Sequence, residues 1–189
     1  MSTVKNNTAQ DRFLQLARLK QNIFHIDDLA RIWKIKNKNN LHTTLKRYNQ
    51  RGLLKRIYRG LYTFDNLNDL NPFVLGVKAL HNYCYISTET VLVSSGIIQQ
   101  SIHYITLVSS RSKRFVIDDN SYYSRQLKDE FLFNDFGIIK KENYNIATIE
   151  RAVADLLYFD PHFYFDNRSA IDWTVVKKIQ KNIGYDFTK

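Results

Sequence analysis

The chain has 189 residues and a formal net charge of +10, and 44% of its residues are hydrophobic. This composition suits one large or two small globular domains and excludes a disordered chain. No run of about 18 apolar residues is present, so no segment is expected to cross a membrane. The single cysteine, Cys84, excludes an internal disulfide and a zinc site built on several thiolates. The N-terminus shows no apolar signal-like segment, and together these features favour a reducing, cytoplasmic location.

The positive charge is concentrated in the first third of the chain. Residues 1–64 contain 14 Lys and Arg against three Asp, a net charge of +11, so the remaining residues carry a net charge of −1. Solubility alone does not require the two signs to be segregated in this way. The asymmetry therefore predicts that the N-terminal part binds a polyanion and that the rest has a different task.

Two helices and a short extended piece are expected at the start of the chain. Thr8 can cap a helix over residues 9–20, whose apolar residues fall on one side. Ile23 and Phe24 then break the helical spacing in a short extended piece. A second helix is expected to open at Asp27 or at the residue before it, because acidic side chains in a first turn favour the helix dipole.

A third helix follows the polar stretch KIKNKNN, with Asn39 or Asn40 as its expected cap. Leu41, Leu45 and Tyr48 recur at the i, i+4, i+7 spacing of a helix and are expected to face the core. The opposite side of this helix is polar and basic, and it carries His42, Thr43, Lys46, Arg47 and Gln50.

The apolar spacing changes from helical to alternating after Gly52, which stands where a left-handed residue ends a helix. The runs LLKRIY and LYTF flank Arg59-Gly60, and two extended runs around a short turn with Gly predict a β-hairpin. Three helices followed by a basic hairpin predict a winged helix-turn-helix over residues 8–64.

A polar, turn-prone segment at residues 65–71 is predicted to link this domain to a second one over residues 72–189. Helices are expected there over residues 72–83, 87–96, 148–160 and 169–183. The strand candidates are HYITLVSS, RFVID, FLFND, GIIKK and YNIAT. The fold class is therefore expected to be α+β, an N-terminal winged helix-turn-helix followed by a mixed α/β domain whose small sheet is flanked by helices.

The third helix and the hairpin together predict a surface that reads double-stranded DNA. An α-helix fits the major groove, where Lys46 or Arg47 can reach guanine or phosphate and Gln50 can pair with adenine. Hairpin cations beside that helix would contact a neighbouring phosphate strand or the minor groove. The predicted DNA-binding residues are His42, Thr43, Lys46, Arg47, Gln50, Arg51, Lys55, Arg56 and Arg59.

Motifs for catalysis are sparse in the second domain. It has no Gly-rich phosphate loop, no H-E-x-x-H and no G-x-S-x-G, and its histidines lack metal-ligand spacing. Asp118-Asp119 and Asp129-Glu130 resemble nuclease acids, but no acid in the chain is followed two positions later by Lys. They are interpreted as loop residues beside strands, so no catalytic residue, metal ligand or cofactor is predicted.

Polar residues near the predicted helix starts have structural interpretations. Arg151 and Asp155 are four residues apart and are expected to pair, either on the helix surface or as an Arg that ties the helix to a loop. The alternative for Glu150, Arg151 and Asp155 is a polar functional site under the ends of the sheet, and the structural interpretation is preferred. Thr148 is expected to cap this helix. Ser87 or Thr88 is expected to cap the helix before Gly96, with Glu89 in its first turn.

Three stretches in this order, RGLLKRIYRGLYTF, YISTETVLVSSGII and IATIERAVADLLYF, resemble the bacterial AbiEi-type antitoxin and transcriptional regulator family over residues 8 to about 160. The resemblance implies a winged helix-turn-helix that represses its own operon by binding inverted repeats, and an antitoxin domain over residues 72–189. It also implies a nucleotidyltransferase-like toxin as a functional partner, often without a stable complex. The chain departs from the family at Thr90-Val91, where small residues are frequent.

Two other function classes remain open. The second domain can be a nuclease or another nucleic-acid-modifying enzyme that the basic domain delivers to its substrate. Alternatively, the basic region can bind an acidic protein partner. A monomer and a dimer on DNA are both compatible with the sequence, and a dimer would read half-sites about 34 Å apart, or a multiple of that spacing.

Overall fold

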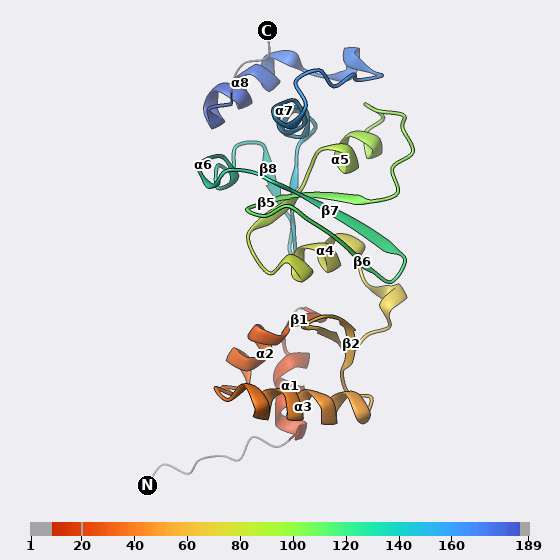
Figure 1. Ribbon diagram of the computed structural model, residues 1–189, viewed down its shortest axis with the longest axis vertical. Helices are drawn as coiled ribbons and strands as arrows, with labels where there is room; N and C mark the ends of the chain where they lie inside the picture. The colour runs from red at the N-terminus through yellow and green to blue at the C-terminus, as the bar shows by residue number, and fades with distance from the viewer. Residues whose placement is uncertain (1–8, 20, 186–189) are drawn as a thin grey trace. The chain divides into compact units, whose positions relative to one another are not determined.

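The computed structural model describes residues 9–19 and 21–185, and the chain divides into two compact units, Met1–Asn71 and Pro72–Lys189 (Figure 1). The segment predicted as a linker, 65–71, lies at the end of the first unit, where Leu67–Asp69 forms a short 3₁₀ helix, η1. Thr8, the predicted first cap, and Lys20 lie outside the described residues.

The first unit is drawn in red to yellow in Figure 1 and combines its helices with a small antiparallel sheet that lies on one side of them. Its strands lie in the order β1-β3-β2, with Phe24 and Arg56 both opposite Tyr62. The expected helices, extended piece and hairpin are all present. The elements are α1 (Ala9–Ala17), β1 (Ile23–His25), α2 (Ile26–Ile32), α3 (Lys38–Gln50), β2 (Lys55–Tyr58) and β3 (Leu61–Thr63).

The core of the first unit is made by one side of each helix and by the sheet. In α3 it takes Leu41, Leu45 and Tyr48, the three residues predicted from their spacing. The Tyr48 ring lies 5.2 Å from that of Trp33, between their centroids. The buried members of this cluster are Leu16, Phe24, Leu29, Trp33, Leu41, Leu45, Tyr48, Leu54 and Tyr62.

The cap of α3 lies two residues before Asn39 and three before Asn40, the two predicted caps. It is Asn37, whose side-chain oxygen accepts from the backbone N–H groups of Asn39 (2.9 Å) and Asn40 (3.2 Å). The two predicted caps are therefore the residues that donate to the real one, because an N-cap accepts from positions N2 and N3. After the helix, Gly52 takes a left-handed φ of 69°, as expected.

The second unit, drawn in yellow-green to blue in Figure 1, contains a mixed six-stranded sheet in the order β6-β7-β5-β4-β9-β8. Helix α4 covers one face of the sheet, and α5 and α7 cover the other (Figure 1). The chain is thus α+β. The elements are α4 (Pro72–Leu80), β4 (Cys84–Ile86), α5 (Glu89–Ser94), β5 (Ile105–Ser109), β6 (Lys113–Ile117), β7 (Asn120–Gln126), α6 (Asp129–Leu132), β8 (Ile138–Lys140), β9 (Asn145–Ala147), α7 (Ile149–Phe159), η2 (Arg168–Ala170) and α8 (Trp173–Ile183).

Two strands of this sheet were not predicted, and one predicted strand is wrong. Strand β4 lies between the helices predicted over residues 72–83 and 87–96, and the first of these ends early, since α4 stops at Leu80 and His81 takes a positive φ of 51°. Strand β7 was missed altogether. FLFND is not a strand, because α6 ends within it, burying Leu132 and leaving Phe133 60% exposed.

The last helix starts later than expected. Residues 168–170 form η2, so the predicted start at Ser169 falls in a 3₁₀ turn. Helix α8 begins after Asp172, whose carboxylate accepts from the N–H groups of Thr174 (3.0 Å) and Val175 (3.1 Å). In the part of the chain that the structure describes, no helix has both the length and the apolar character needed to cross a bilayer.

Candidate nucleic-acid interface and a buried polar network

The side of α3 that faces away from the core is polar and cationic. A helix advances about 100° per residue, so Thr43 and Gln50 point directly away from the buried residues. Lys46 lies on one side of this line and Arg47 on the other. All the predicted residues on this side are exposed, namely His42, Thr43, Lys46, Arg47 and Gln50.

Arg51, another predicted residue, stands at the C-terminal cap of α3. Its N–H donates to the carbonyl oxygen of Arg47 (3.1 Å), and its side chain is exposed. A cation at this end of a helix is favoured by the partial negative charge of the last carbonyl groups. Arg51 therefore supports the helix as well as adding to the charge of its exposed side.

The hairpin supplies three further predicted cations, Lys55, Arg56 and Arg59, and all three are exposed. Lys55 Nζ donates to Asn66 Oδ1 (2.7 Å), and Arg56 Nε donates to the carbonyl oxygen of Tyr58 (3.4 Å). These contacts orient the two side chains along β2 without burying them.

The turn of the hairpin is tight, because Tyr58 pairs with Leu61 and only Arg59 and Gly60 lie between them. Gly60 has a φ of 74°, and a Cβ atom there would lie 3.2 Å from Nε2 of His25. Its carbonyl oxygen also accepts from the N–H of Ile26 (2.8 Å). The close approach explains the glycine and places Arg59 at a fixed turn.

A basic hollow of about 660 Å³ adjoins the first half of α3. Its wall includes Arg12 from α1, Lys34 and Lys36 from the turn after α2, and Thr43 and Arg47 from α3. No acidic residue of the described chain lines it. The sequence reasoning did not name Arg12, Lys34 or Lys36 as site residues. The basic run KIKNK was the only sequence feature that indicated the two lysines. Arg12 of α1 could not be indicated in this way, because it reaches the hollow only through the tertiary fold.

Arg12 is held in this hollow by aromatic neighbours from the core. Its guanidinium carbon lies 6.0 Å from the centroid of the Trp33 ring. Burial raises the pKa of Tyr48, while Arg12 beside it opposes that rise. The Tyr48 phenol therefore stays protonated at neutral pH, and the positive charge of Arg12 is not neutralised by it.

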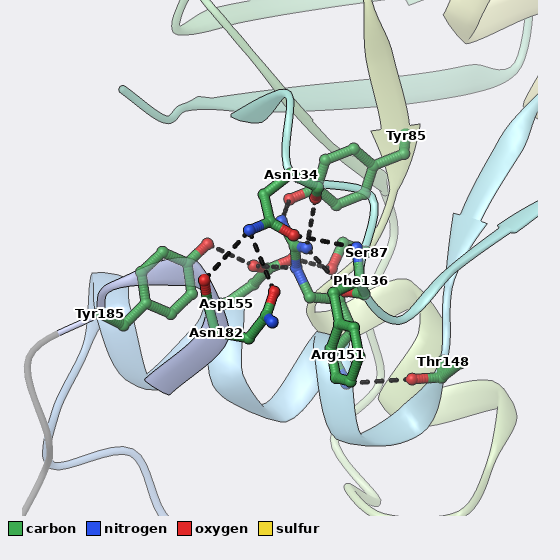
Figure 2. Close-up of polar contacts among 9 residues, drawn as sticks. All are labelled: Tyr85, Ser87, Asn134, Phe136, Thr148, Arg151, Asp155, Asn182 and Tyr185. Carbon is green, nitrogen blue, oxygen red and sulfur yellow. Dashed lines mark hydrogen bonds and ion pairs between the residues drawn. The ribbon is translucent and has the colours of Figure 1, made fainter. Parts of the chain in front are cut away.

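In the second unit, Arg151 and Asp155 form the centre of a buried polar network (Figure 2). Both side chains are fully buried, and Arg151 Nε donates to Asp155 Oδ1 (2.8 Å). The predicted pairing is confirmed, but the pair lies in the core rather than on the helix surface. Arg151 Nη1 also donates to the carbonyl oxygens of Asn134 (2.8 Å) and Phe136 (3.0 Å), so the arginine ties α7 to a loop.

The remaining lone pairs of Asp155 are used by hydroxyl groups from distant parts of the chain. Ser87 Oγ donates to Oδ2 (2.7 Å) and Tyr185 Oη donates to Oδ1 (2.6 Å). Arg151 Nη2 donates to Tyr85 Oη (2.6 Å). The network thereby joins β4, α7, the loop before β8 and the residues after α8, and its groups satisfy one another.

Burial controls the protonation of this network. Burial raises the pKa of Tyr185, and the neighbouring Asp155 carboxylate raises it further. The pKa of Tyr85 is raised well above its ordinary value for the same two reasons. Burial alone would lower the pKa of Arg151, but the adjacent Asp155 outweighs it and holds the pKa above its usual value. Both tyrosines therefore stay protonated, Tyr185 donates to Asp155, Tyr85 accepts from Arg151, and the arginine stays charged.

Thr88, one of the two predicted caps, is the N-cap residue of α5, but neither its side chain nor that of Ser87 makes the expected capping bond among the described residues. The Ser87 hydroxyl is committed to Asp155, and Thr88, at the cap position of α5, makes no capping bond with the described residues. Thr88 has a φ of 52°, a backbone conformation that residues with a Cβ atom rarely adopt. Glu89 is buried and pairs with Arg125 of β7. Thr148 does cap α7, accepting from the N–H of Arg151 (3.2 Å).

The acidic pairs considered for a nuclease lie apart along the chain and are exposed. Asp118 and Asp119 form the two-residue turn between β6 and β7. Asp129 and Glu130 begin α6, so their interpretation as loop residues is wrong, and the pair instead favours the N-terminus of that helix.

The structure therefore exposes every predicted cation of α3 and of the hairpin, and it adds three basic residues, Arg12, Lys34 and Lys36, around the hollow. No protein-family model matches the chain, and a search of curated proteins finds no match.

Proposed function

We propose that the first unit is a winged helix-turn-helix that binds double-stranded operator DNA. We further propose that the chain is a cytoplasmic transcriptional repressor of the AbiEi antitoxin type. The order of elements, helix–strand–helix–helix–hairpin, suits this motif. The observation that carries the proposal is the exposed polar and cationic side of α3, next to a hollow lined by Arg12, Lys34 and Lys36.

The physical basis is a division of labour between base and phosphate contacts. Side chains that point straight out of α3, such as Thr43 and Gln50, can reach base edges in the major groove. The cations around the hollow lie beside the N-terminal half of α3, the end that usually enters the groove, and they suit a phosphate strand. Lys55, Arg56 and Arg59 of the hairpin would contact phosphates or the minor groove as the wing.

The second unit is proposed to counter a nucleotidyltransferase-like toxin without a stable complex, while the first unit represses the shared operon through inverted repeats. This part of the proposal rests on the resemblance of YISTETVLVSSGII and IATIERAVADLLYF to AbiEi-type antitoxins. The second unit has no catalytic role in this proposal. Its buried Arg151–Asp155 network supports the unit mechanically, since both side chains are fully buried.

The test is operator binding by a variant of α3. We expect Lys46→Glu/Arg47→Glu to lower the affinity for DNA from upstream of the chain's own gene by at least about 100-fold at moderate salt, because two phosphate or base contacts become repulsive. The affinity is measured by fluorescence anisotropy. A matched control is Lys178→Glu/Lys181→Glu, the same charge change on the exposed part of α8.

The two variants distinguish specific recognition from general charge. If the α8 control loses as much affinity as the α3 variant, binding depends on net charge alone and the recognition role of α3 is wrong. Full binding by the α3 variant would likewise remove that role. The parent protein should also show a linear fall of log affinity with log salt, with a slope of about −0.9 for each phosphate contacted.

A further inference from the structure

A cavity of about 470 Å³ lies in the second unit between α7, α8 and the segment that joins them, residues 160–172. Much of its wall is apolar and aromatic, with Leu157, Phe163, Phe165, Trp173 and Val176. Phe165 is fully buried and holds the wall in place through its contacts with Phe163 (5.2 Å between ring centroids) and Trp173 (6.0 Å). Cavities of this size and character hold drug-sized organic molecules.

A buried polar group also faces this cavity. Gln180 of α8 lines it, although the residue is only 3% exposed. Among the described residues, none exchanges a hydrogen bond with the Gln180 side-chain amide, while its backbone carbonyl accepts from the N–H groups of Gly184 and Tyr185. The Gln180 side-chain amide offers both donors and an acceptor to a ligand in the cavity.

The ionisable residues that line the cavity are all of the basic type. They are His162, Arg168 and Lys177, and no acidic residue of the described chain joins them. The Arg168 guanidinium carbon lies 4.7 Å from the centroid of the Trp173 ring, and Trp173 Nε1 donates to the Arg168 carbonyl oxygen (3.1 Å). Arg168 is therefore held at the edge of the cavity and does not extend freely into solvent.

The nearby carboxylates are already used by backbone N–H groups. Asp160 accepts from His162 (3.1 Å), and Asp166 accepts from Gln99 (2.8 Å). Asp172 accepts from the first turn of α8. These acids hold the connecting segment in shape, and none of them lines the cavity. The site therefore combines apolar and aromatic walls, a side-chain amide on a buried residue, and two exposed cations, Arg168 and Lys177.

We propose that this cavity binds a nucleotide. The planar base would lie against the apolar and aromatic wall, the Gln180 amide would pair with polar atoms on the base edge, and Arg168 and Lys177 would bind the phosphates. This inference is independent of the proposed DNA-binding role, since its residues all lie in the second unit. It adds a small-molecule site to a chain whose sequence motifs pointed to none.

The experiment is isothermal titration calorimetry of the full chain with ATP, GTP, CTP and UTP, and separately with adenosine, guanosine, cytidine, uridine and inorganic pyrophosphate. At least one nucleotide should bind with a Kd below about 1 mM, more tightly than its own nucleoside and than pyrophosphate. Lys177→Ala should lower the affinity for that nucleotide about tenfold, because a charged contact is lost. Gln180→Leu should lower the affinity for the nucleotide but leave the affinity for pyrophosphate unchanged.

The matched control is Lys181→Ala, which removes an exposed cation of α8 that does not line the cavity, and it should leave the affinity unchanged. Each variant is checked by its thermal midpoint, so that a loss of binding is compared only between folded proteins. The proposal is overturned if no nucleotide binds. It is also overturned if pyrophosphate binds as tightly as every nucleotide, or if the Lys177 and Lys181 variants behave alike.

Discussion

The side chain of Arg151 shows how a full charge is accommodated inside the second unit. Moving a guanidinium out of water costs several kcal/mol, and only a close counter-ion with further hydrogen bonds offsets this cost. Arg151 meets both conditions, since Nε reaches Asp155 at 2.8 Å and Nη1 reaches two backbone carbonyls. Its value to the protein lies in joining segments that are far apart in sequence.

Removal of the counter-ion should be strongly destabilising. Asp155→Asn leaves the charge of Arg151 uncompensated, and we expect the free energy of unfolding of the second unit to fall by about 3 kcal/mol. The reactivity of Cys84 measures this loss of stability. Cys84 is the single cysteine and is buried in β4, and its burial raises the pKa of its thiol to about 12. Its reaction with a disulfide reagent at neutral pH should accelerate about 100-fold.

Glu142→Gln serves as the control, because Glu142 is exposed and a surface change of this kind alters stability by less than about 0.5 kcal/mol. Equal Cys84 reactivity in the Asp155→Asn variant and the control would show that the network does not stabilise the unit.

Tyr185 adds a dependence on alkaline pH. Its pKa in the folded chain lies above that in the unfolded chain, because burial and Asp155 disfavour the phenolate. The stability that follows from this difference is complete below about pH 10, the unfolded value, and is lost as the pH rises further. The free energy of unfolding should therefore fall between about pH 10 and pH 11. In the Tyr185→Phe variant it should fall less steeply over the same range. Parallel pH profiles of the two proteins would contradict this.

At the scale of single elements, helix α3 depends on its cap. Asn37 accepts from two N–H groups that have no partner within the helix, and replacing such a cap by Ala costs about 1 kcal/mol. We expect Asn37→Ala to speed amide exchange in α3 about fivefold, measured by hydrogen exchange. Asn39→Ala, which changes a neighbouring exposed asparagine, should have a much smaller effect. An equal effect of both substitutions would assign the cap elsewhere.

Elements with regular spacing and clear ends could be predicted from the sequence. In α7 the apolar spacing, Thr148 at the start and Asp160 at the end all agree, and the helix spans Ile149–Phe159 as expected. In α3 the buried positions were predicted correctly. The error at its cap, Asn37 in place of Asn39 or Asn40, arose because the sequence offers three asparagines within four positions.

The missed strand β7 shows the limit of such patterns. Its inward residues are Tyr122 and Ser124, and a serine in the core does not resemble a buried position in sequence. Ser124 is tolerated because its hydroxyl bonds to Ser109 Oγ (2.7 Å) and donates to the Arg111 carbonyl oxygen (3.0 Å). Both partners come from other parts of the chain, so this compensation exists only after folding. The burial of Glu89 could not be predicted for the same reason, because its partner Arg125 comes from a distant part of the chain.

At the scale of the whole molecule, charge and fold are divided at nearly the same place. Residues 1–64 carry a net charge of +11, and the first compact unit ends at Asn71. The candidate site shows the same limit of sequence reasoning, because periodicity predicted the exposed cations of α3 but not Arg12, which joins them only in the folded unit. If the proposed DNA binding is correct, the electrostatic part of the affinity should come from the first unit alone.

This leads to a prediction about a fragment of residues 1–71. Its slope of log affinity against log salt, measured by fluorescence anisotropy on duplex DNA, should equal that of the full chain to within about one phosphate contact, or about 0.9. The reason is that the removed residues, 72–189, carry 14 Lys and Arg against 13 Asp and Glu, a net charge of only +1, so their removal changes few phosphate contacts. A fragment of residues 72–189 should show no salt-dependent binding. A folded 1–71 fragment with a slope reduced by two contacts or more would mean that cations of the second unit, such as Arg114 on β6, also bind the phosphate strand.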